Sequence, residues 1–238
     1  MNILIVYAHQ EPKSFNAAMK ETAIAVLAAA GHQVIVSDLY EMQFKATADR
    51  ADFARLGNPD YFKYQIEQNI AYDHGMLAED IHIEQEKLQW ADFVIFQFPL
   101  WWFSVPAILK GWIDRVFCTG FAYGGAHKFY DQGGLVGRKA MLSLTTGGPG
   151  SMYSPTGLNG DIEKILYPIQ HGMLYFVGMQ VLPPFIAWSP ARVSPEQREH
   201  YLLQYTQRLQ TLETTPPLAY PPLEAYDETF QLKETHLP

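Results

Sequence analysis

Residues 2–16 read NILIVYAHQEPKSFN, and this stretch decides the fold class. Residues 2–8 form a continuous apolar run rich in β-branched side chains, which is typical of a strand buried on both faces of a sheet. A polar loop follows at residues 9–13, and Ser14 is placed to cap an alanine-rich helix over residues 15–30 that Gly31 ends. A buried strand, a short loop and a helix in this order open an α/β fold.

The same alternation continues outward along the chain. The patterns predict further strands and helices, with Pro106 beginning one helix and Pro168 bending another. The predicted strands cover residues 33–39, 92–98, 139–146 and 179–188, and the predicted helices cover 77–90, 106–117, 161–176 and 195–212. Five strands alternating with helices predict a doubly wound parallel sheet with helices on both faces.

Two segments fall outside this pattern. Residues 40–77 show no clear period and are too long for an ordinary loop, so we interpret them as a functional excursion. The proline-rich residues 215–238 are predicted to be an irregular C-terminal arm, after a single domain over residues 1–214. Within the helix at 77–90, the expected buried positions are Leu77, Ile81, Ile83, Leu88 and Trp90.

Composition narrows the class of protein. The 238 residues carry 17 basic and 25 acidic side chains, a formal net charge of -8, which argues against nucleic acid and anionic membranes as partners. Pro99 and Pro106 break the apolar run at 93–109, and the N-terminus lacks a basic signal-peptide region, so we expect no integral membrane segment. Cys118 is the single cysteine and is expected to be a buried thiol, which favours a cytoplasmic location. The histidines show no metal-ligand spacing, and no metal is predicted.

Ligands of such sheets bind in the loops that follow the strands. After the first strand, His9, Ser14, Phe15 and Asn16 surround a helix N-terminus, where backbone N–H groups favour an anionic group such as a phosphate. A capping role for Ser14 alone explains the same pattern. No G-x-G-x-x-G or G-x-x-x-x-G-K-[ST] motif occurs, so neither a Rossmann dinucleotide fingerprint nor a P-loop is indicated.

The loops after the third and fourth strands complete the pattern. Residues 99–106 read PLWWFSVP, and three adjacent aromatic residues at a sheet edge predict a pocket or an interface, with burial under residues 40–77 as the alternative. Residues 145–153 read TTGGPGSMY, where the glycines allow close approach of a flat ligand or simply form a turn. The three loops together predict a site for a flat aromatic ring attached to a phosphate, a description that a flavin fits.

These stretches resemble the NAD(P)H:quinone oxidoreductase (DT-diaphorase-like) flavoproteins. The resemblance runs from Ile3 to about Pro217 and is most specific in FQFPLWWFSVPAILK at 96–110 and SLTTGGPGSMY at 143–153, with SDLYEM at 37–42 in support. It implies a flavodoxin-like fold with strand order 2-1-3-4-5, tightly bound FAD, and a homodimer with two active sites at the interface.

The resemblance also implies roles for individual residues. The FAD would be held at His9, Ser14, Phe15, Asn16, Pro99, Leu100, Trp101, Trp102, Phe103, Thr145, Thr146, Gly147, Gly148 and Tyr153, with Lys63 reaching across the dimer. The slot for nicotinamide and quinone would be walled by Trp102, Phe103, Tyr123, Phe176, Gly147 and Gly148, with Tyr123 supplied by the partner subunit. Tyr153 matches the active-site tyrosine of the family, and Asn159 pairs with it.

Three positions depart from the best-known members. Asn159 stands where a histidine is usual, which affects proton relay, and Gly125 stands where the family has a second pocket tyrosine, which affects the substrate range. The chain also ends at Pro238, short of the longer extension of some members, which affects nicotinamide choice.

The resulting expectation is FAD-dependent two-electron reduction of quinones by NAD(P)H, with hydride passing through flavin N5 in a ping-pong order. The alternatives are a flavin-bearing ancillary subunit of an ion-efflux system, an azo or nitro reductase of the same fold, and an electron carrier of flavodoxin type. The aromatic slot favours the enzyme, because a carrier needs no substrate slot.

Overall fold

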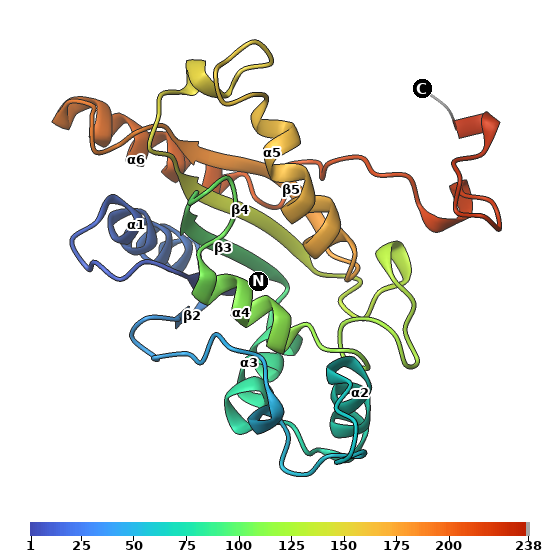
Figure 1. Ribbon diagram of the computed structural model, residues 1–238. Helices are drawn as coiled ribbons and strands as arrows, with labels where there is room; N and C mark the ends of the chain where they lie inside the picture. Colours follow the sequence, from blue (N-terminus) through green and yellow to red (C-terminus); the bar gives the residue numbers. More distant parts are fainter. Residues whose placement is uncertain (237–238) are drawn as a thin grey trace.

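The computed structural model describes residues 1–236, which form a parallel sheet flanked by helices (Figure 1). The strand order is β2-β1-β3-β4-β5, so the order that the resemblance implied is confirmed. The strands are β1 (Asn2–Tyr7), β2 (Gln33–Asp38), β3 (Phe93–Pro99), β4 (Lys139–Thr145) and β5 (Gln180–Ala187). The helices are α1 (Phe15–Ala29), α2 (Tyr64–His74), α3 (Glu79–Trp90), α4 (Ala107–Val116), α5 (Ile162–Ile169) and α6 (Pro195–Gln210).

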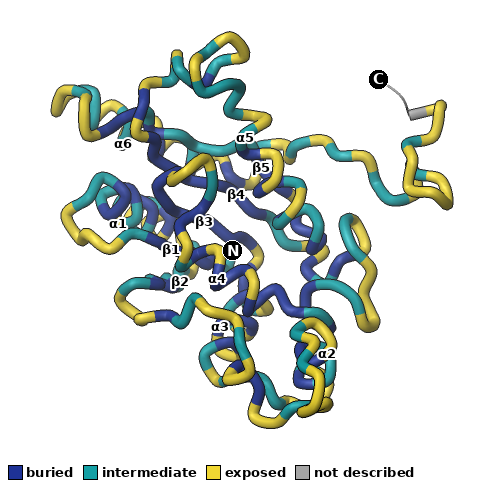
Figure 2. Tube along the Cα trace, viewed as in Figure 1, coloured by how far each residue is buried: buried dark blue, intermediate teal, exposed yellow. Residues whose placement is uncertain are grey.

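The sheet is buried on both faces (Figure 2). Alternate residues of β1 belong to two separate apolar clusters: Leu4 and Val6 pack with the α3, α4 and α5 side, and Ile3 and Ile5 with the α1 and α6 side. This two-sided burial is why the strands read as continuous apolar runs rather than as alternating ones.

Three helices begin at local sequence signals. The Ser14 side chain caps α1 by accepting a hydrogen bond from the backbone N–H of Ala17 at 3.1 Å. Ser194 caps α6 in the same way, with Pro195 as the first helical residue, and Pro106 directly precedes α4. These local signals determine where each helix begins and therefore where the loop before it ends.

Two expectations need correction, and one segment gains detail. Residues 40–77, which show no clear period in the sequence, contain α2 and the short 3-10 helix η1 (Arg50–Asp52). Ile83 is 41% exposed, and α3 instead buries the polar residues Glu84 and Gln85. The helix predicted at 161–176 is an α-helix only to Ile169 and continues as the π-helical segment η4 (Gln170–Tyr175). Pro168 lies in the last turn before this change, consistent with its missing backbone donor.

The predicted arm follows α6 and, within residues 215–236, contains no α-helix and no strand of the sheet; Leu237 and Pro238 lie outside the described residues. Its first part lies along β5, the outermost strand of the sheet, where the backbone N–H of Leu218 donates to the carbonyl of Val181 at 2.7 Å. Beyond this contact the arm extends away from the sheet, with the short helical turns η5 (Leu223–Ala225) and η6 (Glu234–His236) (Figure 1).

Two further findings bear on the class of protein. Cys118 is fully buried, and burial raises the pKa of its thiol to about 11, as expected for an unreactive core cysteine. Among the described residues, none of the helices has the length and apolar character needed to span a membrane.

Candidate functional site

The carboxyl ends of four strands meet at one edge of the sheet. Pro99 of β3 is paired with Thr145 of β4, which in turn is paired with Ala187 of β5, and the end of β1 lies on the other side of β3. The loops after β1, β3, β4 and β5 therefore start at the same level and face the same space.

The loop after β1 leads into the N-terminus of α1. The His9 ring nitrogen Nδ1 accepts a hydrogen bond from the backbone N–H of Glu11 at 3.0 Å, and burial lowers the pKa of His9. His9 is therefore neutral near pH 7, with Nε2 carrying the proton that a ligand can accept. The free backbone N–H groups of the first helical turn lie beside it and favour an anion.

A chain of buried side-chain hydrogen bonds fixes the floor of this region. Asn16 donates to the hydroxyl of Thr145 at 2.9 Å and accepts from Gln97 at 2.8 Å. The hydroxyl of Ser143 donates to Gln97 Oε1 at 2.5 Å. This chain links α1, β3 and β4, and it had a signal in the sequence, because Gln97 interrupts an otherwise apolar strand.

The aromatic residues after β3 form a tight turn rather than a buried cluster. Trp101 and Ser104 exchange two backbone hydrogen bonds, of 3.1 and 2.9 Å, across the turn. The two central residues, Trp102 and Phe103, have φ of 51° and 59°, a conformation that favours glycine. Trp102 is 95% exposed, so burial of this turn under residues 40–77 is excluded.

The loop after β4 is held close to the sheet. The hydroxyl of Thr146 donates to the carbonyl of Gly148 at 2.8 Å and accepts from the backbone N–H of Ser189 at 3.3 Å. A Cβ added at Gly147 would meet no atom within 4 Å, so the backbone at Gly147 borders open space. A flat ligand can therefore approach this backbone closely.

These loops line one cavity of about 610 Å³, which we call the edge cavity. It brings together ten of the predicted residues: His9, Ser14, Phe15, Asn16, Pro99, Leu100, Trp101, Thr145, Thr146 and Gly147. Lys13, Ala18, Pro190, Ala191 and Arg198 also line it and were missed from the sequence. Lys13 and Arg198 supply two positive charges beside the N-terminus of α1, which suits a phosphate-bearing ligand.

Arg198 had no local signal, because it lies in the first turn of α6, far along the chain from the other lining residues. Its guanidinium group is oriented by the carbonyl of Val193, to which Nη1 donates at 2.8 Å. Only the convergence of the loops after β1 and β5 brings it to the edge cavity.

Tyr153 and Asn159 lie in the segment after the β4 loop, outside the lining of the edge cavity. The backbone N–H of Asn159 donates to the carbonyl of Met152 at 2.8 Å, which brings Asn159 back beside Tyr153. The Tyr153 ring packs on Trp188 at a centroid distance of 5.5 Å and is largely buried. Within residues 1–236, no hydrogen bond joins the side chains of Tyr153 and Asn159.

Tyr123 and Phe176 contact each other edge to face at 5.3 Å and line a different cavity of about 610 Å³, which we call the lateral cavity. Gln65 of α2 lies there too and donates to the Tyr123 hydroxyl at 3.3 Å. Lys63 lies just before α2, with its ammonium group 5.3 Å from the ring centroid of Tyr61. Within one chain, ten predicted residues thus line the edge cavity, and Tyr123 and Phe176 line the lateral cavity. The remaining predicted residues line neither of the two: Lys63, Trp102, Phe103, Gly148, Tyr153 and Asn159.

Comparison with known proteins places these residues in context. A family model described as the flavodoxin-like fold matches residues 1–212. The human protein named ribosyldihydronicotinamide dehydrogenase [quinone] is 51% identical over 217 residues, covering 91% of this chain and 94% of that protein. The rat protein named NAD(P)H dehydrogenase [quinone] 1 is 48% identical over 231 residues, covering 96% of this chain and 83% of that protein.

A crystal structure from Klebsiella pneumoniae, of a protein assigned as a quinone reductase, superposes with a TM-score of 0.96 at 44% identity. The match covers 100% of this chain and 96% of that one.

Proposed function

This chain belongs to the NAD(P)H:quinone oxidoreductase family of flavodoxin-like fold and is an NAD(P)H dehydrogenase (quinone), and from this premise we propose that it works with one FAD per chain. In this proposal NAD(P)H and a quinone occupy the same slot in turn, which is a ping-pong order. When bound, FAD would accept a hydride from the nicotinamide and donate a hydride to the quinone.

The observation that carries the proposal is the edge cavity, where a helix N-terminus and an aromatic turn face one space. Lys13, Arg198 and the first turn of α1 suit the diphosphate of FAD. Pro99, Leu100 and Trp101 offer an apolar support to the flavin ring, and the open backbone at Gly147 lies where the polar edge of a flat ring would be met. The residues that line the edge cavity therefore fit FAD.

The strained turn supports the same assignment. Two non-glycine residues with positive φ store backbone strain, and such strain is concentrated at functional sites. The turn exposes the indole of Trp102 and half of the Phe103 ring next to the edge cavity, and Gly148 lies one residue beyond Gly147. In the proposal Trp102, Phe103, Gly147 and Gly148 form one wall of the substrate slot.

The other wall would come from a second copy of this chain. Tyr123 and Phe176 line the lateral cavity, whereas Trp101 lines the edge cavity, so a slot that contains both groups of residues is proposed to be completed by two chains. An exposed Trp102 also favours coverage by a partner. Lys63, exposed at the start of α2, is proposed to reach the FAD of the other subunit.

Tyr153 and Asn159 are proposed to act by hydrogen bonding at the flavin edge. The Tyr153 hydroxyl would donate to negative charge that develops on the ring, and Asn159 would orient the tyrosine. Because asparagine does not titrate, this pair holds a proton in place and does not relay it. A cytoplasmic location and a domain over residues 1–214 with an arm at 215–238 complete the proposal.

Release of the bound flavin tests the proposal. The purified protein is expected to be yellow and to yield one FAD per chain on denaturation, and to consume NAD(P)H with menadione. A protein that binds no flavin on reconstitution would contradict the proposal, and FMN alone would move it toward the azoreductases.

A further inference from the structure

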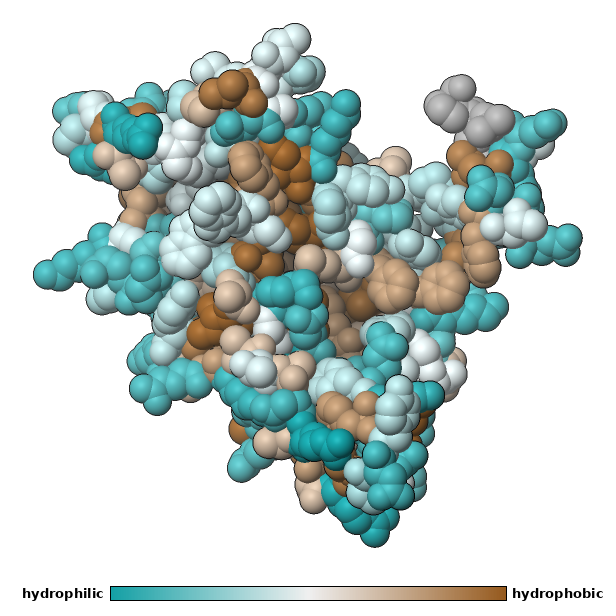
Figure 3. All heavy atoms as spheres, in the orientation of Figure 1, coloured by the Kyte–Doolittle hydropathy of each residue, from teal (hydrophilic) through white to brown (hydrophobic). Residues whose placement is uncertain are grey.

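A chain of polar side chains joins the sheet to α1 and ends at the edge cavity. Its members are Ser143 of β4, Gln97 of β3, Asn16 of α1 and Thr145 of β4, and all four residues are buried. On the face drawn in Figure 3, hydrophilic residues, in teal, are instead spread over the surface. Burial of polar groups costs free energy that their mutual hydrogen bonds only offset, so the position of this chain at the edge cavity needs an explanation.

The direction of the chain depends on which end of the Gln97 amide faces Asn16. The oxygen and the nitrogen of an amide have almost the same shape, so the neighbouring groups decide between the two orientations. Gln97 Nε2 lies 2.8 Å from Asn16 Oδ1 and also 3.9 Å from Sδ of Met19, which is fully buried. A thioether accepts hydrogen bonds but has no proton to donate, so it favours the nitrogen of the amide on its side. Met19 therefore sets the direction of the chain.

With the amide oriented in this way, every donor in the chain points toward the edge cavity. Gln97 Oε1 can only accept, so the Ser143 hydroxyl donates to it at 2.5 Å. Gln97 donates to Asn16 Oδ1, and Asn16 Nδ2 donates to the hydroxyl oxygen of Thr145 at 2.9 Å. The proton of the Thr145 hydroxyl is the last donor of the chain, and no group of residues 1–236 accepts it.

Thr145 differs in this respect from its neighbour Thr146. The Thr146 hydroxyl donates its proton to the carbonyl of Gly148 at 2.8 Å, so that proton is not available to a ligand. Thr145 lines the edge cavity, and its carbonyl accepts from the backbone N–H of Leu100 at 2.8 Å, which holds its backbone in place. A β-branched side chain also has few rotamers. The Thr145 hydroxyl is therefore a donor that is oriented before a ligand binds.

An oriented donor selects the group that lies against it. An acceptor atom gains a hydrogen bond, whereas an N–H group of a ligand would face a second proton. The bond becomes stronger as the acceptor becomes richer in electrons. The polar edge of a flavin carries carbonyl oxygens and ring nitrogens, and the ring gains electron density on reduction. A donor at this edge therefore stabilises the reduced ring more than the oxidised ring.

We propose that Gln97, Ser143 and Met19 are positioning residues that hold the Thr145 hydroxyl as a donor toward the edge cavity and so favour reduced over oxidised flavin. None of the three lines the edge cavity, so they act through Thr145. This inference rests on the proposed function and gives buried residues a part in setting the potential of the same site.

The test measures the midpoint potential of bound FAD by equilibration with dyes of known potential. Gln97→Met keeps the length of the side chain and removes both polar ends of the amide. The affinity for reduced FAD relative to oxidised FAD is expected to fall about tenfold, the effect of one hydrogen bond to an electron-rich acceptor. For a two-electron couple this fall corresponds to a midpoint potential about 30 mV lower. The dissociation constant of oxidised FAD should change less than about threefold.

A double variant tests whether Gln97 acts through Thr145. Thr145→Val removes the hydroxyl with little change in shape and should lower the midpoint potential by a similar amount. Once the hydroxyl is absent, Gln97→Met should lower the potential no further. Full addition of the two shifts would overturn the inference, because Gln97 would then affect the flavin by another route.

Gln85→Met is the matched control. Gln85 is also a buried glutamine, and its Nε2 donates to the carbonyl of Val116 and to Sγ of Cys118, both at 3.1 Å. It lies in α3, outside the edge cavity. This variant should lose as much melting temperature as Gln97→Met, while its midpoint potential stays unchanged. An equal fall in potential in both variants would show a general disturbance of the core and would overturn the inference.

Two milder variants decide the matter if Gln97→Met retains too little FAD to titrate. Met19→Leu keeps the volume of the side chain but removes the acceptor that orients the amide, and Ser143→Ala removes the donor to Gln97 Oε1. Each should lower the midpoint potential. An unchanged or raised potential in both overturns the inference, while FAD binding and quinone reduction still support the proposed function. If the unaltered protein binds no flavin, the proposed function fails, and the inference fails with it.

Discussion

Trp102 and Phe103 hold a backbone conformation that usually belongs to glycine or asparagine, with φ of 51° and 59°. A left-handed conformation costs a bulky residue about 1–2 kcal/mol. The Trp102 side chain is 95% exposed, so its own packing within the chain does not offset that cost. The bonds between Trp101 and Ser104 close the turn and hold it in this form.

Trp102→Gly is therefore expected to change the free energy of unfolding by less than about 1 kcal/mol, because relief of strain offsets the greater freedom of glycine in the unfolded chain. Turnover should fall clearly, since the proposed slot loses one wall. Urea unfolding and steady-state kinetics measure the two effects.

Trp112→Phe is the matched control. Trp112 is fully buried and donates to Glu84 at 2.8 Å, so this substitution should lower the free energy of unfolding by about 1–3 kcal/mol. A large loss of stability in Trp102→Gly would contradict the strain argument.

A second prediction at the scale of single residues concerns the rate of flavin reduction and the Tyr153 hydroxyl. Loss of one hydrogen-bond donor where charge develops costs a few kcal/mol, so Tyr153→Phe should slow flavin reduction roughly ten- to a thousand-fold. Asn159→Ala should cost less, because Asn159 only orients the tyrosine. Stopped-flow absorbance with NAD(P)H gives these rates.

Asn159→His tests the proton relay in the opposite direction. A histidine with an ordinary pKa near 6.5 should introduce a pH dependence between about pH 6 and 8 that the unaltered protein lacks. If the unaltered protein already shows that dependence, another group relays the proton and the role given to Asn159 is wrong.

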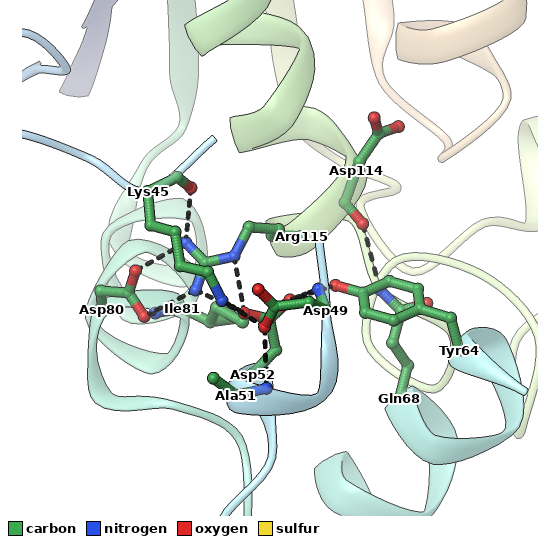
Figure 4. A network of polar contacts seen from close by, with 10 residues as sticks. All are labelled: Lys45, Asp49, Ala51, Asp52, Tyr64, Gln68, Asp80, Ile81, Asp114 and Arg115. Atoms are coloured by element: carbon green, nitrogen blue, oxygen red, sulfur yellow. Dashed lines mark hydrogen bonds and ion pairs between the residues drawn. The ribbon is translucent and has the colours of Figure 1, made fainter. Parts of the chain in front are cut away.

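Among the elements, the segment from β2 to α2 is held by a buried ionic network (Figure 4). The Arg115 guanidinium of α4 makes a bidentate contact with Asp80 of α3, at 2.6 and 3.0 Å, and bonds Asp52 of η1 at 3.0 Å. Lys45 and the hydroxyl of Tyr64 also donate to Asp52, at 2.9 and 2.8 Å. Asp52 and Arg115 are both buried, so this network joins η1 and α2 to the rest of the fold.

Acid should loosen this attachment. Burial of Asp52 opposes its ionisation, but the hydrogen bonds from Arg115, Lys45 and Tyr64 outweigh it and lower the pKa of this carboxyl. A carboxyl with a lowered folded-state pKa contributes stability above its unfolded pKa, about 3.9, and loses that contribution as the pH falls through the folded value. The free energy of unfolding is therefore expected to decrease below about pH 4.

Asp52→Asn removes this charge and should lower the free energy of unfolding by roughly 3 kcal/mol at pH 7, because it leaves buried Arg115 with one carboxylate fewer. The free energy of unfolding of this variant should also decrease less, as the pH falls, than that of the unaltered protein. Urea unfolding between pH 3 and 7 measures both. Asp49→Asn is the control, because Asp49 binds the same Lys45 but its side chain is about half exposed, and it should have little effect. Equal losses in the two variants would contradict the role of burial.

For the whole molecule, the division of the site between two cavities predicts a dimer. The edge cavity and the lateral cavity each hold part of the proposed slot, and the exposed aromatic turn lies beside the first. Sedimentation at low micromolar concentration should give about twice 27.1 kDa. Dilution that produces monomers should abolish turnover, whereas an active monomer would rule out a slot made by two chains.

The strands, most helices and the three loops at the sheet edge were predictable from the sequence. A strand buried on both faces needs a continuous apolar run. The start of a helix is indicated by a capping residue such as Ser14 or by a proline in the first helical position such as Pro195. The ten residues that meet in the edge cavity follow from this, because loops after parallel strands share one edge.

Helix α2 was not predictable in this way, because polar groups hold it in place. Glu67 is buried and accepts from the backbone N–H groups of Gly57 and Asn58, at 2.6 and 2.9 Å, and buried Gln68 donates to the carbonyl of Asp114 at 3.1 Å. A helix anchored by such bonds shows no apolar period. Its partners are separated from it by up to 46 residues, so only the folded chain reveals them.

The positions of Arg198 and Phe230 were decided by tertiary structure alone. Arg198 reaches the edge cavity because β5 lies beside β4, and Phe230 reaches Phe129 because the Leu223–Asp131 bond holds the arm. Local sequence patterns predict which face of an element is buried, since burial repeats with the period of that element. They do not predict contacts between distant loops, because such contacts depend on the order of strands and on single hydrogen bonds between segments far apart in the chain.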